Sequence, residues 1–322
     1  MEDVKKATDF DSPFKQGFQV PVTHQDTPGK QGDLPFEPVN DKLPTEDGGW
    51  QTYKAAGKLQ DKKALITGGD SGIGRAIAIL YAMEGADSFI AYLPEEEEDA
   101  QETKRQVEKH GRKCHLMSTD LRKPDNCQKV IDAALEKFGG RINILVNNAG
   151  YQMMQQDIQD ISIEQWARTF ETNIYSFFYL SKFALPHMKR GDTIINCASI
   201  NAYIGRPDLL DYTSTKGGKY CVCPCACLLL TRYTAIVSFT RGLANQQMSK
   251  GIRVNAVCPG PVWTPLIPAT MSEDAQKQFT SPLGRPAQPS EIATCFVFLA
   301  SADSSMISGQ SLHPNGGVVV NG

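Results

Sequence analysis

The strongest constraint on the fold of this chain is a regular alternation of strand-like and helix-like segments that begins near residue 58. Short apolar runs typical of buried strands recur at residues 62–67, 87–92, 113–118, 142–146, 193–197 and 253–258. Amphipathic patterns of helical period lie at 76–84, 97–110, 124–138 and 165–189. Strands that alternate with helices in this way build βαβ units and a parallel sheet covered on both faces. The sequence therefore predicts one doubly wound α/β domain.

The first 57 residues differ from the rest of the chain in composition. They hold prolines at 13, 21, 28, 35, 38 and 44 among many polar residues, and they have neither helical nor strand periodicity. An extended arm or a disordered tail is expected here, with Trp50 and Tyr53 as candidate anchors at its end. The predicted division is an N-terminal arm over residues 1–57 and a single domain over residues 58–322.

Composition excludes several classes of protein. The chain has 33 Lys and Arg against 36 Asp and Glu, so it has no basic excess with which to bind nucleic acid by bulk charge. It has no apolar run of the roughly 20 residues that a membrane helix needs, and residues 1–10 are too polar for a secretory signal. The 9 cysteines form no disulfide framework, and the 5 histidines show no metal-ligand spacing. A reducing, cytoplasmic setting without a bound metal is expected.

A glycine-rich turn, TGGDSGIG, joins the first strand of the domain to its first helix. Its glycines at 68, 72 and 74 let the backbone approach a pyrophosphate closely, and the helix N-terminus that follows offers free N–H groups and a positive dipole end. The strand–turn–helix context favours a dinucleotide site over an ordinary tight turn. Asp120, at the end of the third strand, is placed to bond an adenine amine, although a plain surface turn would hold an aspartate there equally well.

Tyr212 and Lys216 are four residues apart in a helical segment, which puts both side chains on one face of that helix. Three other features support a functional role for the pair. They are Ser199 at the end of the fifth strand, the NNAG segment at 147–150 after the fourth, and Asn173 in the long helix. In an open parallel sheet, ligands bind at the carboxyl ends of the strands. We therefore expect these groups and the glycine turn to meet at one edge of the sheet.

These motifs, in this order, resemble those of the short-chain dehydrogenase/reductase family over roughly residues 58–322. The PGPVWT segment at 259–264, after the sixth strand, belongs to the same pattern. Finer features, among them GGDSGIGR at 68–75, NAY at 201–203 and HPNGG at 313–317, are similar to a branch of glucose/ribitol dehydrogenase-like and aldehyde reductase-like proteins. The resemblance implies a Rossmann-type sheet of about seven strands and a homo-oligomer, a dimer or a tetramer.

The resemblance also implies roles for single residues. Tyr212 would exchange a proton with the substrate oxygen, and Ser199 would hydrogen-bond that oxygen. Lys216 would hold the nicotinamide ribose, Asn173 would keep a water that relays protons, and Thr264 would contact the carboxamide. The implied cofactor contacts are Thr67, Gly68, Asp70, Ser71, Gly72, Ile73, Gly74, Arg75, Tyr92, Asp120, Leu121, Asn147, Ala149, Gly150, Tyr212, Lys216, Pro259, Gly260, Val262 and Thr264.

Two further expectations concern charge. An ammonium about 4 Å from a phenol is worth roughly 4 kcal/mol at an effective dielectric of about 20, so Lys216 is expected to lower the pKa of Tyr212 towards neutrality. The second strand ends in AYLP at 91–94, without the acid that favours NAD. The acidic run at 95–98 is expected to face solvent at a helix start. NADP is therefore favoured, with Arg75 as the nearest basic residue, and NAD stays open.

Residues 218–234, GKYCVCPCACLLLTRYT, interrupt a helix that the family runs straight on from Lys216 into Ala235. Three interpretations stand: a retained short intron in the gene model, a real loop bulged from the helix, or a metal or redox motif of four cysteines, whose spacing is not a standard zinc pattern. Pro224 is expected to end the helix soon after Lys216. If the segment is present and disrupts the helix, Lys216 is expected to be misplaced.

The predicted activity is the reversible, NADP(H)-linked reduction of an aldehyde or ketone, with a sugar or polyol as one substrate class. A 3-oxoacyl reductase-like enzyme is the alternative within the enzyme class. A catalytically impaired cofactor-binding or scaffold protein is the alternative outside it, because residues 218–234 lie beside the catalytic side chains. The expected partners are a small-molecule substrate and further copies of the chain, with no nucleic acid and no membrane.

Overall fold

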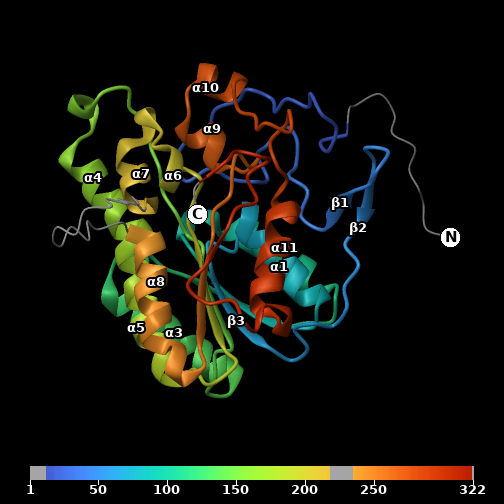
Figure 1. The fold of residues 1–322 in the computed structure, drawn as a ribbon, viewed down its shortest axis with the longest axis vertical. Helices are drawn as coiled ribbons and strands as arrows, with labels where there is room; N and C mark the ends of the chain where they lie inside the picture. The colour runs from blue at the N-terminus through green and yellow to red at the C-terminus, as the bar shows by residue number, and fades with distance from the viewer. Residues whose placement is uncertain (1–11, 218–234, 321–322) are drawn as a thin grey trace, which may run out of the picture.

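The computed structural model describes residues 12–217 and 235–320, which form a central sheet with helices on both faces (Figure 1). Seven strands lie in the order β5-β4-β3-β6-β7-β8-β9, and all neighbours in this sheet are parallel. The strands are β3 (Lys63–Thr67), β4 (Asp87–Tyr92), β5 (Cys114–Ser118), β6 (Ile144–Asn147), β7 (Thr193–Cys197), β8 (Arg253–Val257) and β9 (Ser311–Leu312). The predicted doubly wound sheet is thus confirmed.

The helices cover the sheet in two layers. On one face lie α1 (Gly72–Met83), α2 (Glu97–Glu108) and α11 (Pro289–Ala300); on the other lie α3 (Pro124–Phe138), α5 (Ser176–Ala184) and α8 (Ala235–Gln247). Successive strand residues serve opposite layers, since Leu65 packs against the second layer and Ile66 against the first. This two-sided burial explains why the strands are continuous apolar runs. The shorter helices are α4 (Ile163–Phe170), α6 (Asn201–Ile204), α7 (Leu210–Lys216), α9 (Leu266–Thr270) and α10 (Glu273–Lys277).

The strand order opens a crevice at the carboxyl edge of the sheet. From β3 the chain moves outward through β4 to β5, and it then returns to the other side of β3 to add β6, β7 and β8. Segments that leave β3 and β6 therefore diverge, and open α/β sheets bind ligands at such a switch point. The glycine turn follows β3 and the NNAG segment begins at the end of β6, so both reach this crevice.

The described part of the N-terminal arm is folded, which corrects the disordered-tail alternative for residues 12–57. Val20 and Leu34 are buried in one apolar cluster with Trp263, and the indole Nε1 of Trp263 donates to the carbonyl of Phe36 at 2.9 Å. A small antiparallel hairpin follows, made of β1 (Lys42–Pro44) and β2 (Trp50–Thr52). The arm runs along one side of the domain beside α11 and α9 (Figure 1). Residues 1–11 lie outside the described residues.

The two predicted anchors of the arm differ in the structure. The hydroxyl of Tyr53 bonds the carboxylate of Glu84, which is fully buried and also accepts from the backbone N–H groups of Ala56 and Lys58. Trp50, in contrast, is 38% exposed. Tyr53 therefore fixes the end of the arm to the end of α1, and the expectation that Trp50 shares this role is wrong.

The single long helix predicted over residues 165–189 is divided in the structure. After α4 the backbone makes a π-helical turn over Glu171–Tyr175, continues as α5, and ends in a 3-10 turn over Leu185–His187. The wide turn adds a residue to one helical turn, and such turns often occur at functional sites. Asn173 lies in it.

α7 ends at Lys216, and Gly217 beyond it is extended. The described helix thus ends at Lys216 itself, and residues 218–234, with Pro224 and the three interpretations of them, lie outside the described residues. In the described residues we find no helix that combines the length and the apolar character needed to cross a membrane.

Candidate active site

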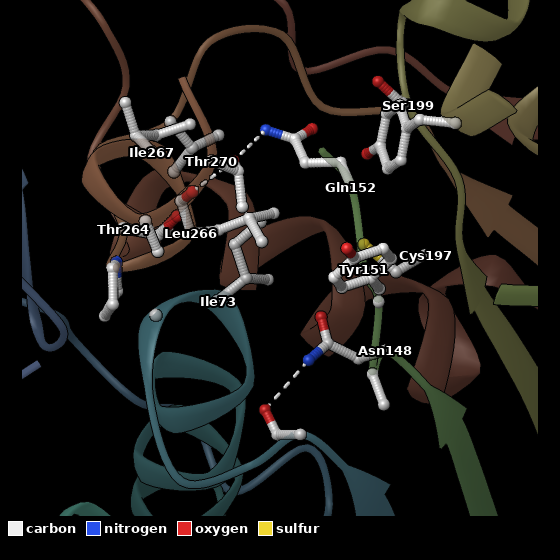
Figure 2. Close-up of a pocket in the computed structure, with 18 of the residues that line it drawn as sticks. Ile73, Asn148, Tyr151, Gln152, Cys197, Ser199, Thr264, Leu266, Ile267 and Thr270 are labelled. Atoms are coloured by element: carbon white, nitrogen blue, oxygen red, sulfur yellow. Dashed lines mark hydrogen bonds between the residues drawn. The ribbon is translucent and has the colours of Figure 1, made fainter. Parts of the chain in front are cut away.

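A cavity of about 460 Å³ occupies the crevice at the carboxyl edge of the sheet. Its walls come from the glycine turn after β3, the ends of β4, β6, β7 and β8, α7, and the loop and helix around α9. Figure 2 shows this convergence, with Ile73 from α1, Asn148 and Tyr151 from the segment after β6, Ser199 after β7, and Thr264 with Leu266 before and in α9. The predicted meeting of motifs at one sheet edge is thus seen in the cavity lining.

Two glycines of the turn are required by close approach. A Cβ on Gly74 would lie 1.8 Å from the carbonyl oxygen of Gly68, so only glycine lets α1 pack against the turn. Gly72 has a φ of +50°, and a Cβ there would lie 3.0 Å from Thr264. The turn therefore brings the first residues of α1 directly to the cavity, where their N–H groups have no partner inside the helix.

Most of the predicted cofactor contacts line the cavity. These are Gly68, Asp70, Ser71, Gly72, Ile73, Tyr92, Asp120, Leu121, Ala149, Gly150, Tyr212, Lys216, Pro259, Gly260, Val262 and Thr264. Thr67, Gly74, Arg75 and Asn147 are not among the lining residues. The buried Asn147 amide instead donates to Asn196 at 2.9 Å. Its neighbour Asn148 lines the cavity and donates to the Gly68 carbonyl at 3.0 Å, a contact that sequence reasoning missed (Figure 2).

Arg75 is turned away from the cavity, contrary to its expected place at the cofactor. Its side chain is 2% exposed, and Nη2 pairs with the carboxylate of Asp99 at 3.0 Å. Nε donates to the Asp70 carbonyl and to Thr103. The guanidinium is therefore used to join α1 to α2, because a buried cation needs a carboxylate partner and filled hydrogen bonds.

The predicted catalytic side chains meet on α7 and the end of β7. The Nζ of Lys216 lies 5.2 Å from the centre of the Tyr212 ring and donates to the carbonyl of Cys197 at 2.9 Å. Ser199 is hydrogen-bonded to the Tyr212 phenol. Lys216 thus lies beside Tyr212 and lines the cavity although α7 ends directly after it, and the expectation that residues 218–234 misplace it stays a prediction.

The pKa of Tyr212 is opposite in direction to our expectation. Burial raises the pKa of the Tyr212 phenol well above its ordinary value of 10.0, and the hydrogen bond from Ser199 only partly offsets this. Burial also lowers the pKa of Lys216, whose Nζ binds a neutral carbonyl instead of a carboxylate. Both groups resist ionisation in a site of low dielectric constant. The predicted lowering of the phenol pKa ignored this desolvation.

Asn173 is hydrogen-bonded to two segments that line the cavity. Its Oδ1 accepts from the backbone N–H of Tyr151 at 2.7 Å, and its Nδ2 donates to the Tyr151 carbonyl at 2.8 Å and to the Thr215 hydroxyl at 3.0 Å. The buried amide therefore joins the segment after β6 to α7, between Tyr212 and Lys216. Asn173 is not among the residues that line the cavity.

Acidic groups gather at the end of the cavity beside β4. Glu96 lines the cavity, so the expectation that all of residues 95–98 face solvent is wrong. Burial raises the pKa of Glu96 to about 8 and that of Asp70 to about 6. Asp120, two residues beyond the end of β5 and not in it, is paired with Arg122 at 2.7 Å.

Other lining residues gave no signal in the sequence. The amide of Gln152 donates to the Thr270 hydroxyl at 2.9 Å across one wall (Figure 2). Thr27, Pro28 and Gly29 reach the cavity from the N-terminal arm. The proline-rich composition of the arm identified it in the sequence. That composition did not indicate that the arm contacts the cavity.

Comparisons with known proteins show what this chain is similar to. The family model that matches residues 68–319 is described as enoyl-(acyl carrier protein) reductase. The chain is 50% identical to glucose and ribitol dehydrogenase of Daucus carota, over 84% of this chain and 89% of that protein. It is 47% identical to NADPH-dependent aldehyde reductase 1, chloroplastic, of Arabidopsis thaliana, over 84% and 90%. A solved short-chain dehydrogenase from Burkholderia cenocepacia, in complex with NADP, is 29% identical and superposes with a TM-score of 0.71 over 81% of this chain and 98% of that one.

Proposed function

The chain belongs to the short-chain dehydrogenase/reductase family of oxidoreductases, and from this premise we propose that it reduces an aldehyde or ketone with NADPH, and catalyses the reverse reaction with NADP. The observation that carries the proposal is the meeting of Tyr212, Ser199 and Lys216 in the same cavity as the glycine turn. The names of two relatives, glucose and ribitol dehydrogenase and an aldehyde reductase, support a sugar, polyol or aldehyde as substrate.

The residues of the cavity fit a dinucleotide. A Cβ at Gly72 would crowd Thr264, which indicates that the turn is shaped for a close neighbour, and the start of α1 supplies N–H donors for a diphosphate. Glu96 has a pKa of about 8, so its carboxyl is mostly protonated at neutral pH. A neutral carboxyl can lie beside the 2′-phosphate of NADP without repelling it. When bound, the nicotinamide cofactor supplies or accepts the hydride.

The protein's own residues handle the proton. As the carbonyl carbon is reduced, its oxygen gains negative charge, and the Tyr212 hydroxyl donates its proton to that oxygen to give the alcohol. The Ser199 hydroxyl donates a hydrogen bond to the same oxygen. Lys216 lies on the same helix face, and when its amine carries a proton it attracts the phenolate that remains. In the reverse reaction, the phenolate accepts the alcohol proton.

The test is a carbonyl panel with the purified full-length chain, followed by the loss of NADPH absorbance. Short aldehydes, aldoses and a 3-oxoacyl thioester are compared, so that the 3-oxoacyl reductase-like alternative is measured directly. We expect turnover of aldehydes or sugars in preference to the thioester. A folded chain that binds NADPH but turns over nothing on the panel would support the alternative of an impaired cofactor-binding protein.

The matched variants are Tyr212→Phe and Tyr175→Phe. Removing the Tyr212 hydroxyl should lower kcat by about 10² to 10⁴, the usual contribution of a general acid, with little change in the Kd of NADPH. Tyr175 is exposed on the outer surface of the domain and does not line the cavity, so its variant should keep the wild-type rate. Equal activity of both variants would contradict the assignment of Tyr212.

We also propose that the protein assembles with further copies of itself, as a dimer or tetramer, in a reducing cytoplasmic setting. Large aromatic side chains on α4 and in the π-helical turn and α5 that follow it remain exposed, with Trp166 at 40%, Tyr175 at 46% and Phe178 at 47%. Several large exposed aromatic side chains on neighbouring elements are typical of a subunit contact. Light scattering on the purified chain would measure its mass, and a monomer at micromolar concentration would contradict this proposal.

A further inference from the structure

We propose that the N-terminal arm is a working part of the dinucleotide site. The arm loop, defined as residues 25–32, forms one wall of the cavity, and Gln31 is a positioning residue that fixes the first turn of α1 where the diphosphate would rest. This inference rests on the proposed function, because it presumes a bound dinucleotide.

The arm loop is closed on itself and docked on the domain. The side chain of Gln25 spans the loop, since its Oε1 accepts from the Lys30 N–H at 2.8 Å and its Nε2 donates to the Lys30 carbonyl at 3.0 Å. Gly29 lies so close to the segment before α9 that a Cβ would come within 2.4 Å of the Pro265 carbonyl. The three residues Thr27, Pro28 and Gly29 then reach the cavity wall.

Gln31 contacts the start of α1 directly. Its side chain is buried, with 1% of the residue exposed, and its Oε1 accepts from the backbone N–H of Gly72 at 2.7 Å. Gly72 is the first residue of α1 and lines the cavity. The arm thus supplies the capping acceptor that Ser71, at the N-cap position, does not supply from its own side chain.

A second set of bonds prevents Gln31 from moving independently of α1. The carboxylate of Asp99 accepts from the backbone N–H groups of Gln31 and Gly32, and the same carboxylate pairs with Arg75 of α1. Arm, α2 and α1 therefore share one buried carboxylate. A shift of the arm would shift the first turn of α1, whose N–H groups form the anion site.

The Nε2 of Gln31 lies beside the start of α1, although Gln31 itself is not among the residues that line the cavity. It is buried and has no hydrogen-bond partner among the residues that the structure describes. A buried donor without a partner is costly, but here its positive end adds to the positive end of the α1 dipole. Both fields favour the negative charge of a diphosphate beside the glycine turn.

The experiment is a fluorescence titration of full-length Gln31→Glu with NADPH and NADH, paired with its melting temperature without ligand. A carboxylate still accepts from the Gly72 N–H, but its charge is buried beside Asp99, so the melting temperature without ligand should also fall. Its negative charge opposes the positive field at the start of α1, so we expect the Kd of NADPH to rise about tenfold or more. The kcat at saturating NADPH should be unchanged.

The matched control is Gln60→Glu, which makes the same charge change before the amino end of β3, at the opposite edge of the sheet. Its Kd should stay at the wild-type value. A wild-type Kd for Gln31→Glu would overturn the proposal. So would a lower kcat at saturating NADPH, because this would indicate that the variant disturbs the whole site and does not act on cofactor binding alone.

A second pair of variants tests the arm loop without changing charge. Gly29→Ala places a Cβ against the Pro265 carbonyl and should displace the loop, whereas Gly32→Ala meets only an ordinary contact of 3.6 Å with Asp99. We expect weaker NADPH binding by Gly29→Ala alone; equal affinity of the two would overturn the role of the loop. If the wild-type chain itself binds neither dinucleotide, the proposed function fails. If the wild type binds NADPH and these variants bind it equally well, only the role of the arm fails.

Discussion

At the residue scale, the proposed role of Tyr212 as the proton donor makes the two reaction directions depend differently on pH. Its pKa is raised above 10.0 by burial, so the phenol keeps its proton through the neutral and mildly alkaline range. Reduction needs the protonated form and oxidation needs the phenolate, whose population grows about tenfold per pH unit below the pKa.

We predict that kcat/KM for reduction stays level between pH 6 and pH 9, while kcat/KM for alcohol oxidation rises with a slope of about one across the same range. Steady-state rates in both directions with one substrate pair would measure this. A plateau of the oxidation rate near neutral pH would contradict it and would instead favour the lowered phenol pKa that the spacing of Tyr212 and Lys216 first indicated.

Glu96 gives a second prediction at this scale, for cofactor choice. Its pKa is raised to about 8, so it is mostly neutral at pH 7 and loses its proton as the pH rises through 8. It lines the cavity close to the end of β4, where the ribose 2′ substituent lies in this kind of fold. The new negative charge should weaken NADPH binding more than NADH binding, by roughly fivefold between pH 7 and pH 9.

The measurement is the Kd of each cofactor as a function of pH, in the wild type, in Glu96→Gln and in Glu98→Gln. Glu98 is a matched control, because its side chain is 90% exposed. Only Glu96→Gln should make the ratio of the two Kd values independent of pH. If the ratio changes with pH equally in all three proteins, another group is responsible.

At the scale of the element, α7 holds two of the proposed catalytic side chains, Tyr212 and Lys216, although it is short. Lys216 is its last residue, yet its Nζ is held by the Cys197 carbonyl at the end of β7. Asn173 bonds Thr215 of the same helix. Tertiary contacts therefore position α7, so its placement does not depend on continuity with α8.

This predicts the effect of removing residues 218–234, so that Gly217 is joined to Ala235. We expect the Kd of NADPH to change by less than about threefold, because Lys216 is held by the domain and not by that segment. Fluorescence titration and kcat of the two chains, side by side, would test it. A deletion variant that binds NADPH much more tightly than the full chain would contradict the independence of α7 and would support the expectation of a misplaced lysine.

Some of these helices and strands could be predicted from the sequence, and others could not. The strands and main helices could be predicted from this sequence alone. Buried strands leave continuous apolar runs, and helices packed on one face leave an apolar pattern of helical period. The π-helical turn at Asn173 could not be predicted, because its cause is the bond of Asn173 to Tyr151 and Thr215, residues 22 and 42 positions away. The inward position of Arg75 likewise depends on Asp99 of the next helix.

At the scale of the whole molecule, the arm and the domain form one packed body. Apolar arm residues share a cluster with Trp263, Ile267 and Met271 of the segment that carries Thr264. The sequence separated the arm from the domain because prolines hide any periodicity, and long-range packing has no local signal. The site was predictable where motifs follow strand ends, as at Ser199 and the glycine turn, but its wall of Thr27, Pro28 and Gly29 was not.

We propose that this chain, with residues 218–234 present, is a functional NADP(H)-dependent oxidoreductase. The most direct test is a fluorescence titration of the purified full-length chain with NADPH and with NADH at pH 7. We predict saturable binding of NADPH, tighter than that of NADH, and a melting temperature that rises with NADPH concentration, since a ligand that binds only the folded state stabilises it. A folded chain that binds neither cofactor would contradict the account.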